Sequence, residues 1–160
     1  VMAGFIAGFD GDTPDSIVEM ADRLYEIGVD VPFLSVLTPY KGTPLYNELE
    51  RDGRLLLDRG WEFSNGYNVA FQPGEMSPEA LLHAHRRLWR RAFSPRHVLK
   101  RILHSAPRLR LGGLLLSLAM NGFYGFKALR CNAPREMPLP FPVSVPASDR
   151  QPLPILEQGV

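Results

Sequence analysis

The first part of the chain alternates apolar and polar stretches in the order strand, helix, strand. Residues 2–9 and 31–37 are almost continuously apolar, as expected for strands covered on both faces. Between them, Thr13 and Pro14 suit the cap and first position of a helix, and apolar residues then recur at helical spacing, namely Ile17, Met20, Ala21, Leu24 and Ile27. This order predicts a βαβ unit with two parallel strands and a right-handed crossover. Since two strands do not form a stable sheet alone, we expect partner strands from an upstream segment or from another chain.

The middle of the chain predicts three further helices and a hairpin. Each helix opens with a hydroxyl residue followed by proline, at Thr43, Ser77 and Ser94. The two longer helices carry apolar faces made of Leu81, Leu82, Leu88, Trp89, Ala92 and Phe93 and of Val98, Leu99, Ile102 and Leu103. Before them, Asn65 and Gly66 predict the turn of a β-hairpin whose strands carry Trp61, Phe63, Tyr67, Val69 and Phe71.

The last third contains an apolar segment and a proline-rich tail. Residues 111–126 pass without a charge, but they are fewer than the roughly 20 residues that span a bilayer, and glycines weaken the segment as a helix. Residues 134–154 hold seven prolines, and so we expect residues 131–160 to be extended and disordered.

Composition places the chain among globular domains and limits its chemistry. Of its 160 residues, 45% are apolar and 22% are charged, which is typical of one folded domain. The single cysteine, Cys131, excludes an internal disulfide framework, a zinc site with several cysteines and a self-sufficient iron–sulfur site. We therefore expect no metal ligands in this chain and interpret Cys131 as an incidental thiol.

The net charge of +1 hides two regions of opposite sign. Residues 1–79 hold 14 acidic and 5 basic residues, whereas residues 80–135 hold 12 basic residues and no acidic one. Nucleic acid is not an expected partner, because no RNA-binding or helix-turn-helix motif accompanies the basic residues. Two interpretations stay open: a solvated basic face packed on the acidic region, or contact between an anionic membrane surface and the basic residues that precede the apolar segment.

The turn after the first strand is the strongest candidate for a ligand site. Gly4, Gly8 and Gly11 form the pattern G-x-I-x-G-x-x-G at the carboxyl end of a strand, where α/β folds bind ligands and where glycine lets a flat ligand approach the backbone. Alternatively, the glycines only shape the turn. A phosphate site is excluded, because three carboxylates within residues 10–15 would repel it, and the spacing fits neither a dinucleotide fold, a P-loop nor a calcium loop.

Four longer segments carry a more specific pattern. They are GFIAGFDGDTPDSI, LTPYKGTPLYNELERDGRL, a stretch containing Trp61, and MSPEALLHAHRRLWRRAFS. In this combination they resemble the C-terminal part of cobalamin-binding radical S-adenosylmethionine (SAM) proteins, in the branch that carries an uncharacterised helical domain behind the barrel and includes hopanoid methylases. The resemblance covers roughly residues 2–105.

The resemblance implies a fold class and a nucleoside site. The fold would be α/β, with the last two parallel strands of a partial (β/α)6 radical SAM barrel followed by an α-helical C-terminal extension. In that family a G-x-I-x-G motif packs against the adenine of SAM, and residues just past the next strand add backbone and apolar contacts. The residues that the resemblance assigns to this pocket are Gly4, Ile6, Gly8, Leu37, Thr38 and Pro39. The family's motif often ends in glutamate, whereas Gly11 stands here.

The resemblance also implies cofactors that this chain does not hold by itself. The family binds a 4Fe–4S cluster through C-x-x-x-C-x-x-C, which is absent from the sequence, so we expect the chain alone to be inactive. The intact enzyme would cleave SAM reductively to a 5′-deoxyadenosyl radical and abstract hydrogen from an unactivated carbon. It would then deliver a methyl group through cobalamin, with a hydrophobic, lipid-like substrate as the expected acceptor.

Other candidate residues have a structural explanation beside the functional one. His83 and His85 are two residues apart on a helix without an acidic neighbour, and we interpret them as structural or solvated. Tyr40 and Lys41 would lie at the catalytic end of the barrel by analogy. Three aromatic residues either border a substrate channel or pack in the core: Trp61, Tyr67 and Phe71.

Together these observations divide the chain into three parts. We interpret residues 1–58 as the C-terminal end of a radical SAM barrel, residues 59–130 as a mainly helical extension and residues 131–160 as the tail. The expected partners are the missing N-terminal part of the barrel and an anionic membrane surface or lipid-like substrate, in the cytoplasm or on the inner face of the membrane. The alternatives are a non-enzymatic adaptor that docks on a membrane or protein, and a truncated gene product without independent activity.

Overall fold

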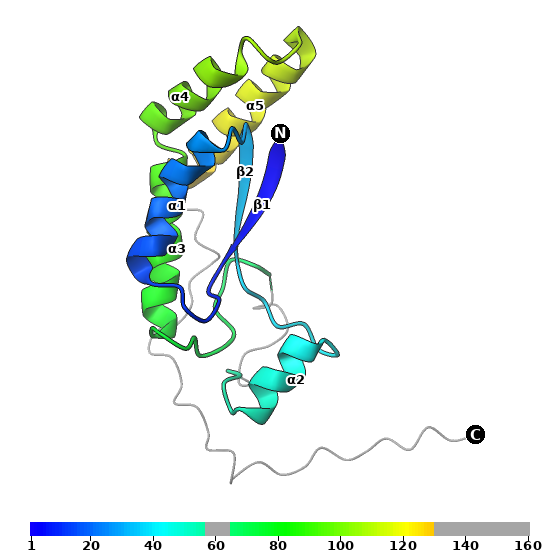
Figure 1. Cartoon of the computed structure of the whole chain (residues 1–160), viewed down its shortest axis with the longest axis vertical. Coiled ribbons are helices and arrows are strands. Elements are labelled where there is room, and N and C mark those ends of the chain that lie inside the picture. Colours follow the sequence, from blue (N-terminus) through cyan, green and yellow to red (C-terminus); the bar gives the residue numbers. More distant parts are fainter. Residues whose placement is uncertain (57–64, 130–160) are drawn as a thin grey trace, which may run out of the picture.

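The predicted βαβ unit comes first in the fold, and helices follow it. The computed structural model describes residues 1–56 and 65–129, and this part contains two strands and five helices (Figure 1). The strands are β1 (Met2–Ala7) and β2 (Val31–Val36). The helices are α1 (Pro14–Glu26), α2 (Pro44–Arg51), α3 (Pro78–Ala92), α4 (Pro95–Ser105) and α5 (Leu111–Leu129).

The α/β class and the parallel strand pair are confirmed, while the barrel that the resemblance implies stays a prediction. The predictions for Trp61, Phe63, Cys131 and the proline-rich tail lie outside the described residues.

The helix starts follow directly from the sequence. The side chain of Thr13 accepts a hydrogen bond from the backbone N–H of Ser16 at 3.1 Å, and that of Ser77 accepts one from Ala80 at 3.2 Å, as capping residues do. One position was wrong: Ile27 is 65% exposed rather than part of the buried face. The reason is that α1 ends one residue earlier, at Glu26.

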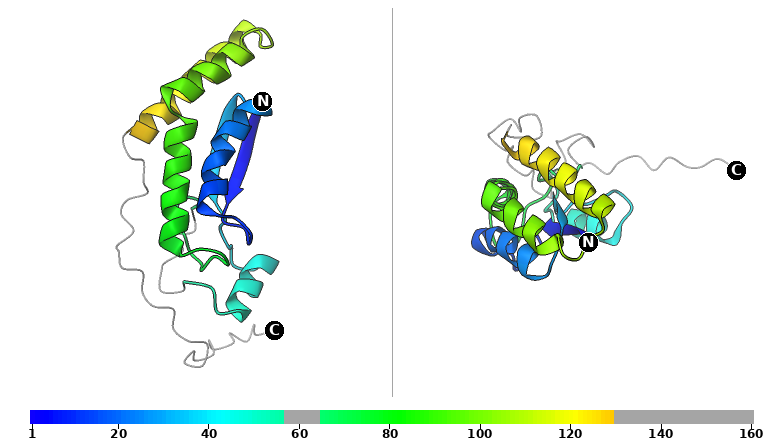
Figure 2. Two further views of the ribbon diagram at one scale, coloured as in Figure 1. Left: turned by 60° about the vertical axis from the view of Figure 1, so that its left-hand side comes forward. Right: turned by 90° about the horizontal axis from the view of Figure 1, so that it is seen from above.

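Strand β1 is covered on one face and exposed on the other, whereas β2 buries Val31 and Pro32 on opposite faces. They pair in register from Met2 opposite Val31 to Ala7 opposite Val36, and side chains alternate between the two faces. On one face, Ala7 and Val36 are buried with residues of α1 and α3, which pack along each other (Figure 2). The largest members of this core are Ile17, Leu24, Leu34, Phe71, Leu81 and Leu88. The opposite face of β1 remains exposed.

The outer edge of β2 is closed by side chains and a loop. The carbonyl oxygen of Leu34 accepts a hydrogen bond from the indole Nε1 of Trp89 at 3.2 Å, and the N–H of Val36 donates to the carbonyl oxygen of Gly66 at 2.6 Å. In the described part of the chain, β1 pairs with β2 alone. The sheet can therefore continue past β1 but not past β2.

His85 lies behind this closed edge. It is 3% exposed, its Nε2 is 3.3 Å from the carbonyl oxygen of Leu34, and burial lowers the pKa of its imidazole to about 4. Its neighbour His83 is exposed. The interpretation of the two histidines as structural or solvated thus fits His85 in the core and His83 on the surface.

The buried imidazole makes stability depend on pH. In the unfolded chain the imidazole of His85 binds a proton below about pH 6.5, whereas in the folded chain it does so only below about pH 4. The free energy of unfolding should therefore fall by up to about 3 kcal/mol as the pH is lowered over that range. We expect His85→Gln to lose this component in urea unfolding at pH 7, 5.5 and 4, whereas His83→Gln keeps it. Equal pH dependence in His85→Gln and the unchanged protein would contradict this explanation.

Only the turn and the second strand of the predicted hairpin lie among the described residues. Asn65 does form a turn, since its Oδ1 accepts hydrogen bonds from the N–H groups of Tyr67 at 3.0 Å and Asn68 at 3.2 Å. Phe71 forms an antiparallel bridge with Leu55, while its pairing with the segment of Trp61 and Phe63 stays a prediction. Phe71 is fully buried in the core, with its ring beside Gly8, which favours the core-packing interpretation for this residue.

Helix α5 buries two polar side chains beside Tyr124 and Ala128, which pack on the core, and it exposes large apolar side chains on its other side. Ser117 and Asn121 are 3% and 1% exposed. The large apolar residues on the other side are 42–73% exposed, namely Leu111, Leu115, Leu116, Leu118, Phe123 and Phe126. No helix in the described part of the chain is long and apolar enough to cross a membrane.

A buried polar network explains why α4 and α5 place polar side chains in the interior. The guanidinium of Arg101 donates to the carbonyl oxygen of Ala92 at 2.7 Å and to Asn121 Oδ1 at 2.8 Å. The Nδ2 of Asn121 donates to the carbonyl oxygens of Asp30 at 2.8 Å and Ser117 at 2.9 Å. Burial lowers the pKa of Arg101 to about 10, which still leaves it cationic at neutral pH.

The apolar face predicted for α4 was therefore wrong in part. Leu99 and Leu103 are 58% and 64% exposed, because the side chain of Arg101 occupies the space between α4 and α5 instead.

Candidate functional site

The uncovered face of β1 is the part of the predicted site that offers a flat surface. Gly4 is exposed, and a Cβ built on it would meet no atom within 4 Å. Met2 and Ile6 lie on the same face and are 49% and 44% exposed. Two apolar side chains and a bare stretch of backbone between them form a surface on which a planar ring system fits.

Gly8 has a different environment from Gly4. Its φ is 107°, and a Cβ at this position would lie 2.8 Å from Leu81 Cδ2 and 3.4 Å from the ring of Phe71. Glycine is therefore required here by the turn and by the close approach of α3. The prediction that Gly8 lines an adenine pocket stays a prediction, and only its backbone is available for such a contact.

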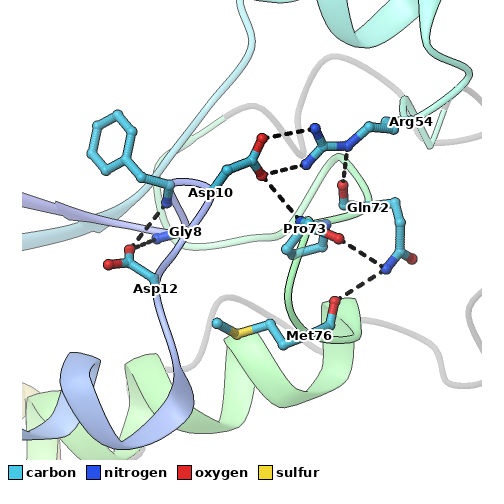
Figure 3. Close-up of polar contacts among 9 residues, drawn as sticks. Gly8, Asp10, Asp12, Arg54, Gln72, Pro73 and Met76 are labelled. Atoms are coloured by element: carbon cyan, nitrogen blue, oxygen red, sulfur yellow. Dashed lines mark hydrogen bonds and ion pairs between the residues drawn. The ribbon is translucent and has the colours of Figure 1, made fainter.

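The carboxylate of Asp12 closes the turn that follows β1. Its Oδ2 accepts hydrogen bonds from the N–H groups of Gly8 at 2.8 Å and Phe9 at 3.0 Å (Figure 3). These are N–H donors that a bound phosphate would need, and here a side chain of the protein already uses them. The geometry supports the exclusion of a phosphate site at this turn.

Asp10 ties the same turn to the segments that follow α2. Its carboxylate accepts two hydrogen bonds from the guanidinium of Arg54, at 2.6 and 3.0 Å, and one from the N–H of Gly74 at 3.1 Å (Figure 3). Arg54 also donates to the carbonyl oxygen of Gln72 at 2.9 Å. Hydrogen bonding to Arg54 lowers the pKa of Asp10 below its usual value. Sequence reasoning missed this pair, because its two members are 44 residues apart and each belongs to an ordinary polar stretch.

The residues after β2 lie beside the glycine turn. The N–H of Leu37 donates to the carbonyl oxygen of Ala7 at 2.8 Å, so that the parallel ladder continues by one step and places Leu37 next to Gly8. The hydroxyl of Thr38 donates to the carbonyl oxygen of Val36 at 3.0 Å, and Pro39 is buried. The structure thus brings the two predicted segments to the same carboxyl end of the strands, while their contact with a nucleoside stays a prediction.

The remaining candidates lie around this end of the sheet or in the core. Tyr40 is 57% exposed and Lys41 is exposed, both in the loop between β2 and α2. The ring of Tyr67 lies 6.2 Å from that of Trp89, at the covered edge of β2. Within residues 1–56 and 65–129, no group of three metal-binding side chains comes together.

Fold and site define an α/β protein with an uncovered glycine-containing strand and a turn fixed by two carboxylates. Comparison with known families matches residues 43–113 to a domain of unknown function (DUF4070), which includes α2, α3 and α4.

One curated relative of the chain is an enzyme. The chain is 30% identical over 98 residues to bacteriochlorophyllide d C-12(1)-methyltransferase of Chlorobaculum tepidum. The similar region is 61% of this chain and 21% of the methyltransferase, so the chain spans about a fifth of the length of that relative. The protein is therefore a distant homologue of a methyltransferase.

Proposed function

We propose that this chain is the C-terminal part of a radical SAM enzyme, in which the uncovered face of β1 forms part of the wall against which the adenine of SAM lies. The observation that carries the proposal is the bare backbone at Gly4, flanked by the exposed side chains of Met2 and Ile6. The segment at Leu37, Thr38 and Pro39 follows β2 at the same end of the sheet and supplies the expected neighbouring contacts.

The open edge of β1 supports the view that the sheet belongs to something larger. Two strands do not form an independently stable sheet, and β2 is closed on its outer side by Trp89 and Gly66. The partner strands, which we assign to the N-terminal part of the barrel, would pair with β1.

The two cofactors of the proposed enzyme fit this chain to different degrees. SAM, which supplies the radical precursor when bound, suits the flat apolar face of β1 through its adenine. A 4Fe–4S cluster does not fit, because the chain has a single cysteine, and its ligands must come from the N-terminal part. Cobalamin would likewise bind outside this chain.

The reaction class follows from the relative rather than from the geometry. The curated relative is named as a methyltransferase of a bacteriochlorophyllide. Methylation of a hydrophobic substrate is accordingly the reaction that we propose for the intact enzyme.

The test uses the complete enzyme that the proposal requires, in which an N-terminal barrel part with the cysteine motif precedes the residues described here. After anaerobic reconstitution with iron and sulfide, we expect it to form 5′-deoxyadenosine from SAM. Gly4→Val should raise the KM for SAM roughly tenfold or more, because the added side chain occupies the space of the purine. Gly112→Val, at an exposed glycine of α5 with no atom within 4 Å of its Cβ position, serves as the control. Absence of 5′-deoxyadenosine would refute the enzyme class, and an unchanged KM in Gly4→Val would refute the role of β1.

A further inference from the structure

The outer side of α5 carries large apolar side chains that stay exposed in the described part of the chain. The buried side chains of Ser117 and Asn121 fix the rotation of α5 about its axis. Because of this rotation, the apolar side of the helix faces outward. We call this side the α5 apolar face and define it by Leu111, Leu115, Leu116, Leu118, Phe123 and Phe126. An apolar surface of this extent on a helix marks an interaction site.

Cations without a carboxylate oxygen in ion-pair distance lie on α4 and at both ends of α5. Arg108 and Arg110 precede the first turn of α5, and Lys127 stands in its last turn. The neighbouring helix α4 adds Arg96 and Lys100. Among the described residues, none of these five has a carboxylate oxygen within 4.0 Å. Residues 80–135 contain no acidic residue at all, so α4 and α5 themselves supply no carboxylate that would neutralise these cations.

This combination favours one class of partner. A helix with an exposed apolar side and basic residues at both ends, which is not long and apolar enough to cross a membrane, is suited to lie in the interface of a membrane. An acidic protein would complement the charges but would not require six large apolar side chains between them. We propose that α4 and α5 dock the protein on the surface of an anionic lipid bilayer, with the α5 apolar face inserted at the level of the headgroups.

The position of the two helices suits such docking. Figure 1 shows α4 and α5 at the end of the sheet where β1 begins, whereas α2 and the turn after β1 lie at the other end. A membrane bound at α5 therefore leaves the carboxyl ends of both strands accessible. This inference rests on α4 and α5 alone and does not depend on the proposed function.

Flotation of the full chain with lipid vesicles tests the proposal. We expect binding to vesicles of phosphatidylcholine and phosphatidylglycerol at low salt and little binding to phosphatidylcholine alone. Arg110→Gln combined with Lys127→Gln should lower the partition coefficient roughly 25-fold, since each charge contributes about fivefold. Leu115→Gln combined with Phe123→Gln should lower it at least roughly tenfold. All four residues lie outside the buried core, so the variants are expected to fold, and circular dichroism verifies this.

Matched substitutions elsewhere on the surface serve as controls. Phe9→Gln in the turn after β1 and Arg51→Gln at the end of α2 change side chains that are also exposed, and we expect binding to stay unchanged. Three results would overturn the proposal. The first is equal loss of binding in the controls, and the second is full binding in the Leu115 and Phe123 variant, which would mean adsorption by charge alone. The third is that the unchanged chain sediments as a dimer and does not bind vesicles, whereas the Leu115 and Phe123 variant sediments as a monomer. This result would mean that a second copy of the chain covers the α5 apolar face.

Discussion

Replacing Gly8 by alanine should lower the free energy of unfolding by about 3 kcal/mol, the larger of the effects that we expect in the strand pair. Its φ of 107° is unfavourable for any residue with a side chain, and the new Cβ would lie 2.8 Å from Leu81 Cδ2. Backbone strain contributes about 1–2 kcal/mol, and crowding of a packed core contributes about 1–3 kcal/mol. Urea denaturation of the full chain at neutral pH measures the sum.

Gly4 provides the matched control for Gly8 on the same strand. A Cβ there meets no atom within 4 Å, and so Gly4→Ala should leave stability unchanged or raise it by about 0.5–1 kcal/mol. If the two substitutions destabilise the protein equally, the difference between a packing glycine and a surface glycine in this motif is disproved.

Asn121→Ala should destabilise the protein by about 3 kcal/mol. The substitution leaves the buried guanidinium of Arg101 with the carbonyl oxygen of Ala92 as its remaining partner, and its Nε already lacks one. It also removes the donor to the carbonyl oxygen of Asp30 at the start of β2. A buried polar group that loses its partner costs about 1–3 kcal/mol, and a charged one costs more. Thermal or urea unfolding of the full chain checks the value.

Gly122→Ala is the control for this substitution, one residue further along α5. Gly122 is exposed and its Cβ position is empty, so alanine should stabilise the helix by about 0.5–1 kcal/mol. A loss below about 0.5 kcal/mol in Asn121→Ala would mean that the network does not hold α5 in place.

The sequence predicted the elements whose determinants are local. Thr13 and Ser77 each cap a helix with the next residue a proline, and both helices begin where these residues place them. The parallel strand pair also followed from local order, because a strand, a helix and a strand within 36 residues leave few other arrangements.

Features that depend on distant residues were missed. The pair of Asp10 and Arg54 joins positions 44 residues apart, and nothing in either neighbourhood indicates the other. The burial of Arg101 was missed for a related reason: a basic residue in a basic stretch predicts exposure, and only contact with Asn121, 20 residues later, reverses it. Because Arg101 is buried instead, Leu99 and Leu103 are exposed, although the helical periodicity of the sequence predicted that they would be buried.

The difference between the two strand edges also bears on how this chain would misassemble. On β2, hydrogen bonds from Trp89 and to Gly66 occupy backbone groups that a foreign strand would need. Among the described residues, the opposite edge of β1 has no paired strand, so its backbone N–H and C=O groups can pair with another strand. Within the described residues, a swapped oligomer or a fibril would therefore start at residues 2–7, and a short peptide that pairs with β1 would inhibit such growth.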